Sequence, residues 1–143
     1  MDRFTRNYSI ALAAIVVGLL VFWIVSTWNP RVAELNKILK ADAELADYAY
    51  PFRVVKLDDG VATLSSPRSF ELPAMTYLAV IDPSLANKPQ DDPDMLAAQN
   101  ELIHHQKRAQ SLIQGEPDVT SVRWQLDRDW YTKRGIDVES LMR

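Results

Sequence analysis

The stretch IALAAIVVGLLVFWIVSTW, residues 10–28, decides where the whole chain sits. It carries no charged side chain over 19 residues, and the hydroxyl side chains of Ser26 and Thr27 come at its far end. An α-helix of this length spans roughly 28 Å, which is close to the thickness of the hydrocarbon core of a bilayer. A helix this long in a soluble protein would normally show a polar face, and this one shows none. The stretch therefore predicts a transmembrane helix.

The flanks of this stretch favour an uncleaved anchor over a cleaved signal peptide. The apolar run is longer than the about 7–15 residues of a signal-peptide core, and no A-x-A cleavage site follows it. Arg3 and Arg6 precede the run, and a short basic tail usually stays in the cytoplasm, although three basic residues also follow within twenty positions. We therefore expect residues 1–9 to be a cytoplasmic tail and residues 10–28 to cross the membrane once.

Aromatic and small residues suggest how this span is held. We expect Ile10, where the span begins, and Trp23 and Trp28, near its far end, to anchor it; the amphipathic indole rings of the two tryptophans are favoured at membrane interfaces. Ala14 and Gly18 form a small-xxx-small pair, which allows two helices to approach closely, so a homodimer through this face is one expectation. Such pairs also occur in spans that stay single, which is the alternative.

Composition narrows the classes of partner. The chain has 143 residues and a formal net charge of −3, and most of its acidic side chains follow the span. A mildly acidic domain argues against binding to nucleic acid and against a polybasic grip on lipid headgroups. The chain has no cysteine, which removes disulfides, thiolate catalysis and iron–sulfur ligation. The lipid bilayer is the one partner that the sequence indicates directly.

The residues after the span predict a small α+β domain. Asn29 followed by Pro30 is typical of a helix start, so residues 29–47 are expected to form a membrane-proximal helix. Residues 48–143 are long enough for one domain with its own core. In it, residues 52–57 and 61–66 flank Asp58-Asp59-Gly60, which predicts a β-hairpin.

Three further segments complete the expected fold. Residues 75–81, MTYLAVI, are apolar on both faces and suit a central strand. Asp92-Pro93 opens a helix over residues 93–114, and the alternation over residues 119–127 predicts another strand. The tail after residue 128 should form a short helix, a break at Gly135 and a final turn. We therefore expect a roughly four-stranded sheet with one packed helix.

No residue pattern in the chain identifies a reaction. His104 and His105 are its only histidines, and neighbouring residues on a helix point about 100° apart, so they cannot bind one metal together. We expect both on a solvated helix face. Three aspartates at positions 91, 92 and 94 lack the spacing of a calcium loop, and helix capping accounts for Asp92. We predict no catalytic residue, no metal site and no cofactor, and leave enzyme activity open.

The stretch DRDWYTKRG, residues 127–135, is the most chemically mixed part of the chain. Aromatic residues flanked by charges of both signs are typical of interface anchors, so Arg128, Trp130, Tyr131 and Arg134 are candidates for contact with a partner protein. The alternative is that Trp130 covers the edge of the core while its charged neighbours stay solvated.

Two resemblances accompany these patterns. The passage LIQGEPDVTSVRWQLD, residues 112–127, resembles the helix-to-strand unit of small periplasmic BON-type domains, which attach to membranes or partners; here the unit occurs once. The whole chain resembles short bacterial single-span proteins that carry a glutamine synthetase adenylyltransferase label. Nucleotidyltransferases of that class use a Gly-Ser motif before an Asp-x-Asp metal pair. Asp127-x-Asp129 has no Gly-Ser before it, so the motifs do not support the activity in that label.

Two functions follow as expectations. The first is a non-catalytic domain, anchored in the bacterial inner membrane with its N-terminus in the cytoplasm, that binds a partner protein in the periplasm. The second, which the label implies, is a membrane-held enzyme of the nucleotidyltransferase type that uses scattered carboxylates or the Asp127 and Asp129 pair.

Overall fold

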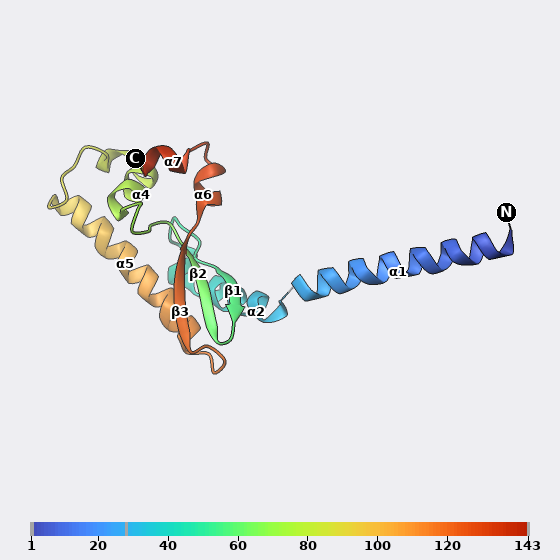
Figure 1. Ribbon diagram of the computed structural model, residues 1–143. Coiled ribbons are helices and arrows are strands. Elements are labelled where there is room, and N and C mark those ends of the chain that lie inside the picture. The colour runs from blue at the N-terminus through green and yellow to red at the C-terminus, as the bar shows by residue number, and fades with distance from the viewer. Residues whose placement is uncertain (1, 28, 143) are drawn as a thin grey trace. The chain divides into compact units, whose positions relative to one another are not determined.

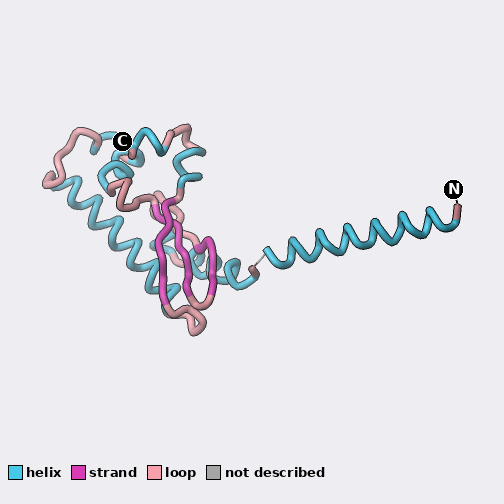
Figure 2. Tube along the Cα trace, viewed as in Figure 1, coloured by secondary structure: helices cyan, strands magenta, loops and turns pink. Residues whose placement is uncertain are grey.

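The computed structural model describes residues 2–27 and 29–142, and the chain divides into two units, residues 1–31 and 32–143 (Figure 1). The first unit consists mainly of helix α1, Arg3–Thr27. The second contains the helices and strands of a mixed α+β domain (Figure 2).

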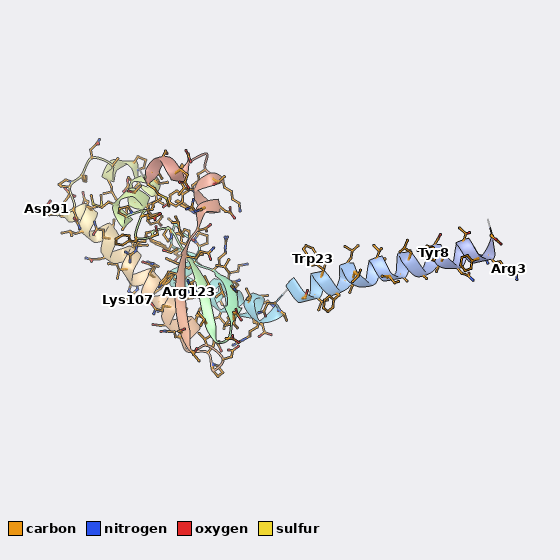
Figure 3. All side chains as sticks on the ribbon, viewed as in Figure 1. Arg3, Tyr8, Trp23, Asp91, Lys107 and Arg123 are labelled. Atoms are coloured by element: carbon orange, nitrogen blue, oxygen red, sulfur yellow. The ribbon has the colours of Figure 1, made fainter. Side chains whose placement is uncertain are left out.

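Helix α1 is the one helix in the described residues that is long and apolar enough to cross a membrane. Its window Arg3–Ser26 has a mean hydropathy of 2.6, and none of that window is buried by the rest of the chain. The side chains of Ile10 and Trp23 are exposed, as the labelled Tyr8 and Trp23 side chains in Figure 3 illustrate. Trp28, the third expected anchor, lies outside the described residues. The helix fits a single-pass membrane protein, as the sequence predicted.

The expected dimer face of α1 is open. Apart from Gly18 itself, its two chain neighbours and the backbone of α1, no heavy atom of the described residues lies within 4 Å of the point where a Cβ on Gly18 would stand. Ala14 is exposed on the same helix. The dimer itself stays a prediction.

The membrane-proximal segment forms two helices where the sequence predicted one. Helix α2 covers Pro30–Ala41, and α3 covers Ala43–Ala46. Asp42 separates them because its ψ of 119° leaves the helical region, and its side chain accepts a hydrogen bond from the backbone N–H of Leu45. An aspartate is a favoured residue for the cap of a helix, and here it starts a new one. The inner side of this segment packs into the core through three buried side chains, Leu35, Leu39 and Leu45.

The sheet has three strands in the order β1-β2-β3, where the sequence predicted about four. Strands β1, Val54–Asp58, and β2, Val61–Ser66, form the predicted antiparallel hairpin. Its turn uses positive φ at both Asp59 (48°) and Gly60 (79°). Strand β3, Ser121–Leu126, pairs with β2 in parallel, so that the last residues of both strands, Ser66 and Leu126, lie opposite each other.

The missing fourth strand is helix α4, Ala74–Ile81, and the prediction of a strand at residues 75–81 was wrong. Pro73, with φ −64° and ψ 157°, ends the extended loop and starts this helix. A run that is apolar on both faces has neither a helical nor a strand period, so its pattern cannot separate a buried helix from a buried strand. Tyr77 and Leu78 of α4 are buried in the core.

Helix α5, Pro93–Gln114, supplies the connection that a parallel pair of strands needs. It packs against β2 and β3 and follows α4 and the short 3₁₀ helix η1, Pro83–Leu85. Asp92 caps α5 by accepting hydrogen bonds from the backbone N–H groups of Asp94 and Met95, as predicted. The chain ends with α6, Arg128–Thr132, and α7, Val138–Leu141, separated by Gly135 at φ 72°.

Aromatic side chains dominate one part of the core. The ring of Tyr50 makes edge contacts with the rings of Phe52, Tyr77 and Trp130, at centroid distances of 5.0, 6.3 and 5.7 Å. Such pairs add to the stability that burial of the rings provides. Tyr50 joins this aromatic cluster to a polar group, because its hydroxyl donates to the carboxylate of Asp127.

Candidate functional site

A hollow with charged walls lies at the end of the sheet where β2 and β3 both finish. Parallel strands present their carboxyl ends at the same edge, and ligands of α/β proteins commonly bind there. Asp127 follows β3 directly, and its backbone N–H donates to the carbonyl of Ser66, the last residue of β2. This hydrogen bond holds the two strand ends together.

A pocket of about 260 Å³ opens at this point, and we call it the sheet-end pocket. Charged groups of both signs line it beside an apolar strip. Its lining residues are Arg53, Val55, Ser65, Gln125, Leu126, Asp127, Arg128 and Asp129.

Asp127 is the central residue of the sheet-end pocket. Its side chain is only 4% exposed, and both carboxylate oxygens accept hydrogen bonds. The Tyr50 hydroxyl donates to Oδ2 at 2.8 Å, and the backbone N–H of Trp130 donates to Oδ1 at 3.1 Å, which caps α6. The Arg53 guanidinium reaches Oδ1 at 3.5 Å. A buried carboxylate needs such partners, because an unpaired buried charge is strongly unfavourable.

The ionisation of Tyr50 shows which role this group of residues can take. Burial raises the pKa of Tyr50 well above its ordinary value, and the neighbouring Asp127 carboxylate raises it further. Tyr50 therefore stays protonated at physiological pH and acts as a donor to Asp127. Both oxygens of Asp127 thus accept hydrogen bonds from inside the domain, which gives this acid a structural role.

The pocket wall still offers groups that can recognise a ligand. Arg53 is 45% exposed and makes a single long contact with Asp127, so most of its five N–H donors remain available. Gln125 and Asp129 are exposed beside it. Arg128 is also exposed and pairs with Glu139 at 2.6 Å. This mixture of donors and acceptors can form hydrogen bonds with a polar ligand.

The structure brings together only part of the interface that the sequence predicted. Trp130 is 5% exposed and Tyr131 is fully buried, so neither ring is available to a partner, and that part of the prediction was wrong. The Tyr131 hydroxyl donates to the carbonyl of Pro67. The alternative, in which Trp130 covers the edge of the core, describes what the structure has.

The two arginines of that predicted interface remain at the surface. The Arg134 guanidinium lies 3.9 Å from the ring centroid of Trp130, a cation–π contact, and donates to the carbonyl of Trp130 at 3.0 Å. Arg128 lines the sheet-end pocket. The sequence reading missed Arg53, Ser65 and Gln125 as site residues, because only the parallel pairing of β2 with β3 places them together.

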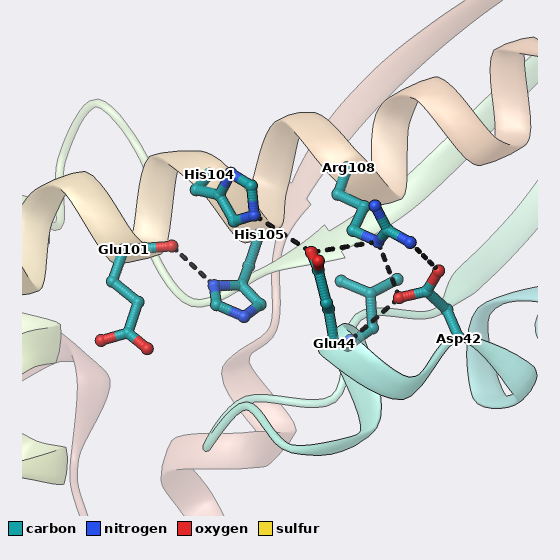
Figure 4. A network of polar contacts seen from close by, with 7 residues as sticks. Asp42, Glu44, Glu101, His104, His105 and Arg108 are labelled. Carbon is teal, nitrogen blue, oxygen red and sulfur yellow. Dashed lines mark hydrogen bonds and ion pairs between the residues drawn. The ribbon is translucent and has the colours of Figure 1, made fainter.

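A second polar network joins α3 to α5 (Figure 4). Arg108 donates to both carboxylate oxygens of Asp42, at 2.8 and 2.7 Å, and lies 3.3 Å from Glu44. The hydrogen bond from Arg108 holds the pKa of Asp42 below its ordinary value of 3.8. His104 lies 3.1 Å from the Glu44 carboxylate. These contacts hold α3, the helix that Asp42 caps, against α5.

The two histidines of α5 occupy different environments. His104 is exposed, as predicted. His105 is buried, and its ring stacks on Tyr48 with centroids 4.2 Å apart and planes at 14°, so the prediction of a solvated face was wrong for this residue. Its Nδ1 lies 2.7 Å from the carbonyl oxygen of Glu101, which is a structural contact.

Among residues 2–27 and 29–142, no group of three or more His, Cys, Asp or Glu side chains is placed to hold a metal ion. In the acidic loop before α5, Lys88 pairs with Asp94 at 2.6 Å, and Asp92 is used as the helix cap. The pair of Asp127 and Asp129 does not present two free carboxylates, because both oxygens of Asp127 accept hydrogen bonds within the domain.

Comparison of the chain with protein-family models, with curated proteins and with solved structures finds no match.

Proposed function

We propose that this chain is a membrane-anchored, non-catalytic domain that binds a partner protein at the sheet-end pocket. Helix α1 would cross the bacterial inner membrane, with the N-terminus in the cytoplasm and the domain in the periplasm. The observation that carries the proposal is a pocket in which the buried acid is already satisfied while exposed donors and acceptors surround it.

Two features support recognition over catalysis. The oxygens of Asp127 accept hydrogen bonds from Tyr50 and from the backbone of Trp130, which leaves this acid without a free role in proton transfer. Arg53 and Gln125 are exposed at the pocket and can form directional contacts with a polypeptide. Arginine is enriched in protein interfaces for this reason.

Photocrosslinking in intact membranes tests the proposal. The photoreactive residue p-benzoylphenylalanine is introduced at Gln125 in the pocket and, as a control, at the exposed Asp91, which lies in a different part of the domain (Figure 3). We expect a discrete protein adduct at position 125 that is absent at position 91 and is lost in the Arg53→Glu background. No adduct at 125, or equal adducts at both positions, would contradict the proposal.

Two further measurements address placement and the enzyme alternative. Alkaline phosphatase fused after Arg143 should be active, and a fluorescent protein fused there should stay dark, if the domain is periplasmic. The purified full chain should show no thermal shift with ATP and Mg²⁺. A clear shift would favour the nucleotidyltransferase alternative.

A further inference from the structure

One loop of the domain presents a fully exposed aromatic side chain. The Phe70 turn, residues 67–73, connects β2 to α4, and the Phe70 side chain is completely accessible. The other large apolar side chains exposed on the domain, Val55, Leu96 and Ile103, are only 38–44% exposed. Two residues further along, Leu72 is fully buried.

Hydrogen bonds within the Phe70 turn fix its shape. The hydroxyl of Ser69 accepts from the backbone N–H groups of Glu71 and Leu72, at 3.2 and 3.1 Å. The backbone N–H of Ser69 donates to the carbonyl of Leu72 at 2.9 Å. Phe70 therefore stands at the tip of a closed, serine-capped turn whose far end is anchored in the core.

The root of the Phe70 turn is also tied to the domain. The hydroxyl of Ser66 accepts from the backbone N–H of Arg68 at 3.2 Å, and Arg68 Nε donates to Gln106 Oε1 at 2.9 Å. The carbonyl of Pro67 accepts a hydrogen bond from the hydroxyl of Tyr131 in α6, the helix that follows Asp127. The turn thus starts at the same end of the sheet as the sheet-end pocket.

We propose that Phe70 is the anchor residue of the partner interface and that it inserts into an apolar pocket with a basic rim on the partner protein. This inference rests on the proposed function, because it specifies the surface that the partner must have. An aromatic side chain on a preformed turn loses little conformational freedom on binding, and interface energy concentrates in such anchors. The basic rim is expected because exposed Glu71 stands beside Phe70.

The charge around Phe70 favours a protein surface over the bilayer. Glu71 would be repelled by anionic lipid headgroups, which attract lysine and arginine instead. Arg68, the cation of the turn, is exposed and offsets this charge in part, but its Nε is directed to Gln106 Oε1 on α5, at 2.9 Å. Loops that rest at a membrane interface are typically rich in tryptophan and tyrosine, and the Phe70 turn has neither.

The experiment measures the adduct formed through p-benzoylphenylalanine at position 125 of the full chain in intact membranes. Loss of an interface anchor weakens binding by about 30-fold or more, so at low expression Phe70→Ala should reduce the adduct by about that factor. Leu96→Ala, which truncates another exposed apolar side chain, should leave the adduct unchanged. Phe70→Trp should retain it, and Glu71→Lys should reduce it. The thermal midpoint of Phe70→Ala should equal that of the parent chain.

Each outcome has a distinct meaning. An unchanged adduct in Phe70→Ala would overturn this inference and leave the proposed function standing, whereas the absence of any adduct at position 125 in the parent chain would overturn both. Because the chain has no cysteine, Phe70→Cys and Leu96→Cys can each carry a single polarity-sensitive dye in nanodiscs. We expect both dyes to report water, and an apolar signal confined to position 70 would assign Phe70 to the bilayer and overturn the inference.

Discussion

Raising the pH should unfold the domain, because its tyrosine hydroxyls are buried. Burial raises the pKa of Tyr50, Tyr77 and Tyr131 above the ordinary value of 10.0, and all three side chains are fully buried. Burial also raises the pKa of Tyr48. A pKa raised in the folded state means that each residue contributes its full stability below pH 10.0 and loses that contribution as the pH rises toward the folded-state pKa.

The size of this effect follows from the number of tyrosines that stay protonated in the folded state. At about pH 11, one unfolded tyrosine with a pKa of about 10 gains about 1.4 kcal/mol of free energy by ionising. Three such residues remove about 4 kcal/mol, which is most of the free energy of unfolding of a domain with about 5 kcal/mol. We therefore expect cooperative unfolding between about pH 10 and pH 12.

The assay uses the full chain in nanodiscs with Tyr8→Phe, so that the four remaining tyrosines all belong to the domain. Phenolate absorbance and tryptophan fluorescence are followed together as the pH rises. Both signals should change in a single transition above pH 10, and Tyr50→Phe should lower the final phenolate signal by one residue in four. Phenolate absorbance that rises at pH 10 while the fluorescence keeps its folded value would refute the reasoning.

Three further predictions concern stability, measured by urea unfolding of the full chain. Asp42→Asn keeps the helix cap but removes the charge that pairs with Arg108; since the pKa of Asp42 is lowered, the variant should be less stable above pH 3.8, and the difference should vanish as the pH falls below that value. Gly135→Ala should cost about 1 kcal/mol through positive φ alone. Gly60→Ala should cost more stability than Gly135→Ala, because its Cβ would also lie 2.8 Å from the Thr120 hydroxyl. An equal loss of stability in the two variants would contradict this steric contribution. Asp127→Asn should cost about 2 kcal/mol by weakening charged hydrogen bonds, and an unchanged urea midpoint would exclude the structural role assigned to this acid.

Local signals in the sequence were enough for the elements that carry them. The turn Asp58-Asp59-Gly60 predicted the hairpin, because Asp-Gly is strongly favoured where a hairpin turn needs positive φ. Asp92-Pro93 predicted the start of α5, because proline is favoured at the first position of a helix. Residues 75–81 carried no such signal, and the strand prediction failed there. His105 did carry one: it lies three residues after Leu102 and four before Ala109, on the buried stripe of α5.

The sheet-end pocket could not be predicted from local sequence patterns. Arg53 and Asp127 are 74 positions apart and meet only because β3 pairs in parallel with β2 after a long crossover. Nothing in the residues around either one specifies that pairing. Phe70 was missed for a different reason, since an isolated apolar residue in a loop gives no pattern from which its exposure can be read.

The side chain of Asn36 in α2 covers the backbone of Val54, the first residue of the edge strand β1. Its amide accepts from the N–H of Val54 at 2.7 Å and donates to the carbonyl of the same residue at 3.0 Å, so it occupies both backbone groups as a neighbouring strand would. The charged side chain of Lys56 on β1 disfavours the pairing of another strand along the rest of this edge. Proteins confined to a bilayer surface meet their own copies at high effective concentration, where an open strand edge invites chain-to-chain pairing. Asn36 therefore occupies the backbone groups of Val54 that a further strand would use, which disfavours strand pairing at this point of the β1 edge.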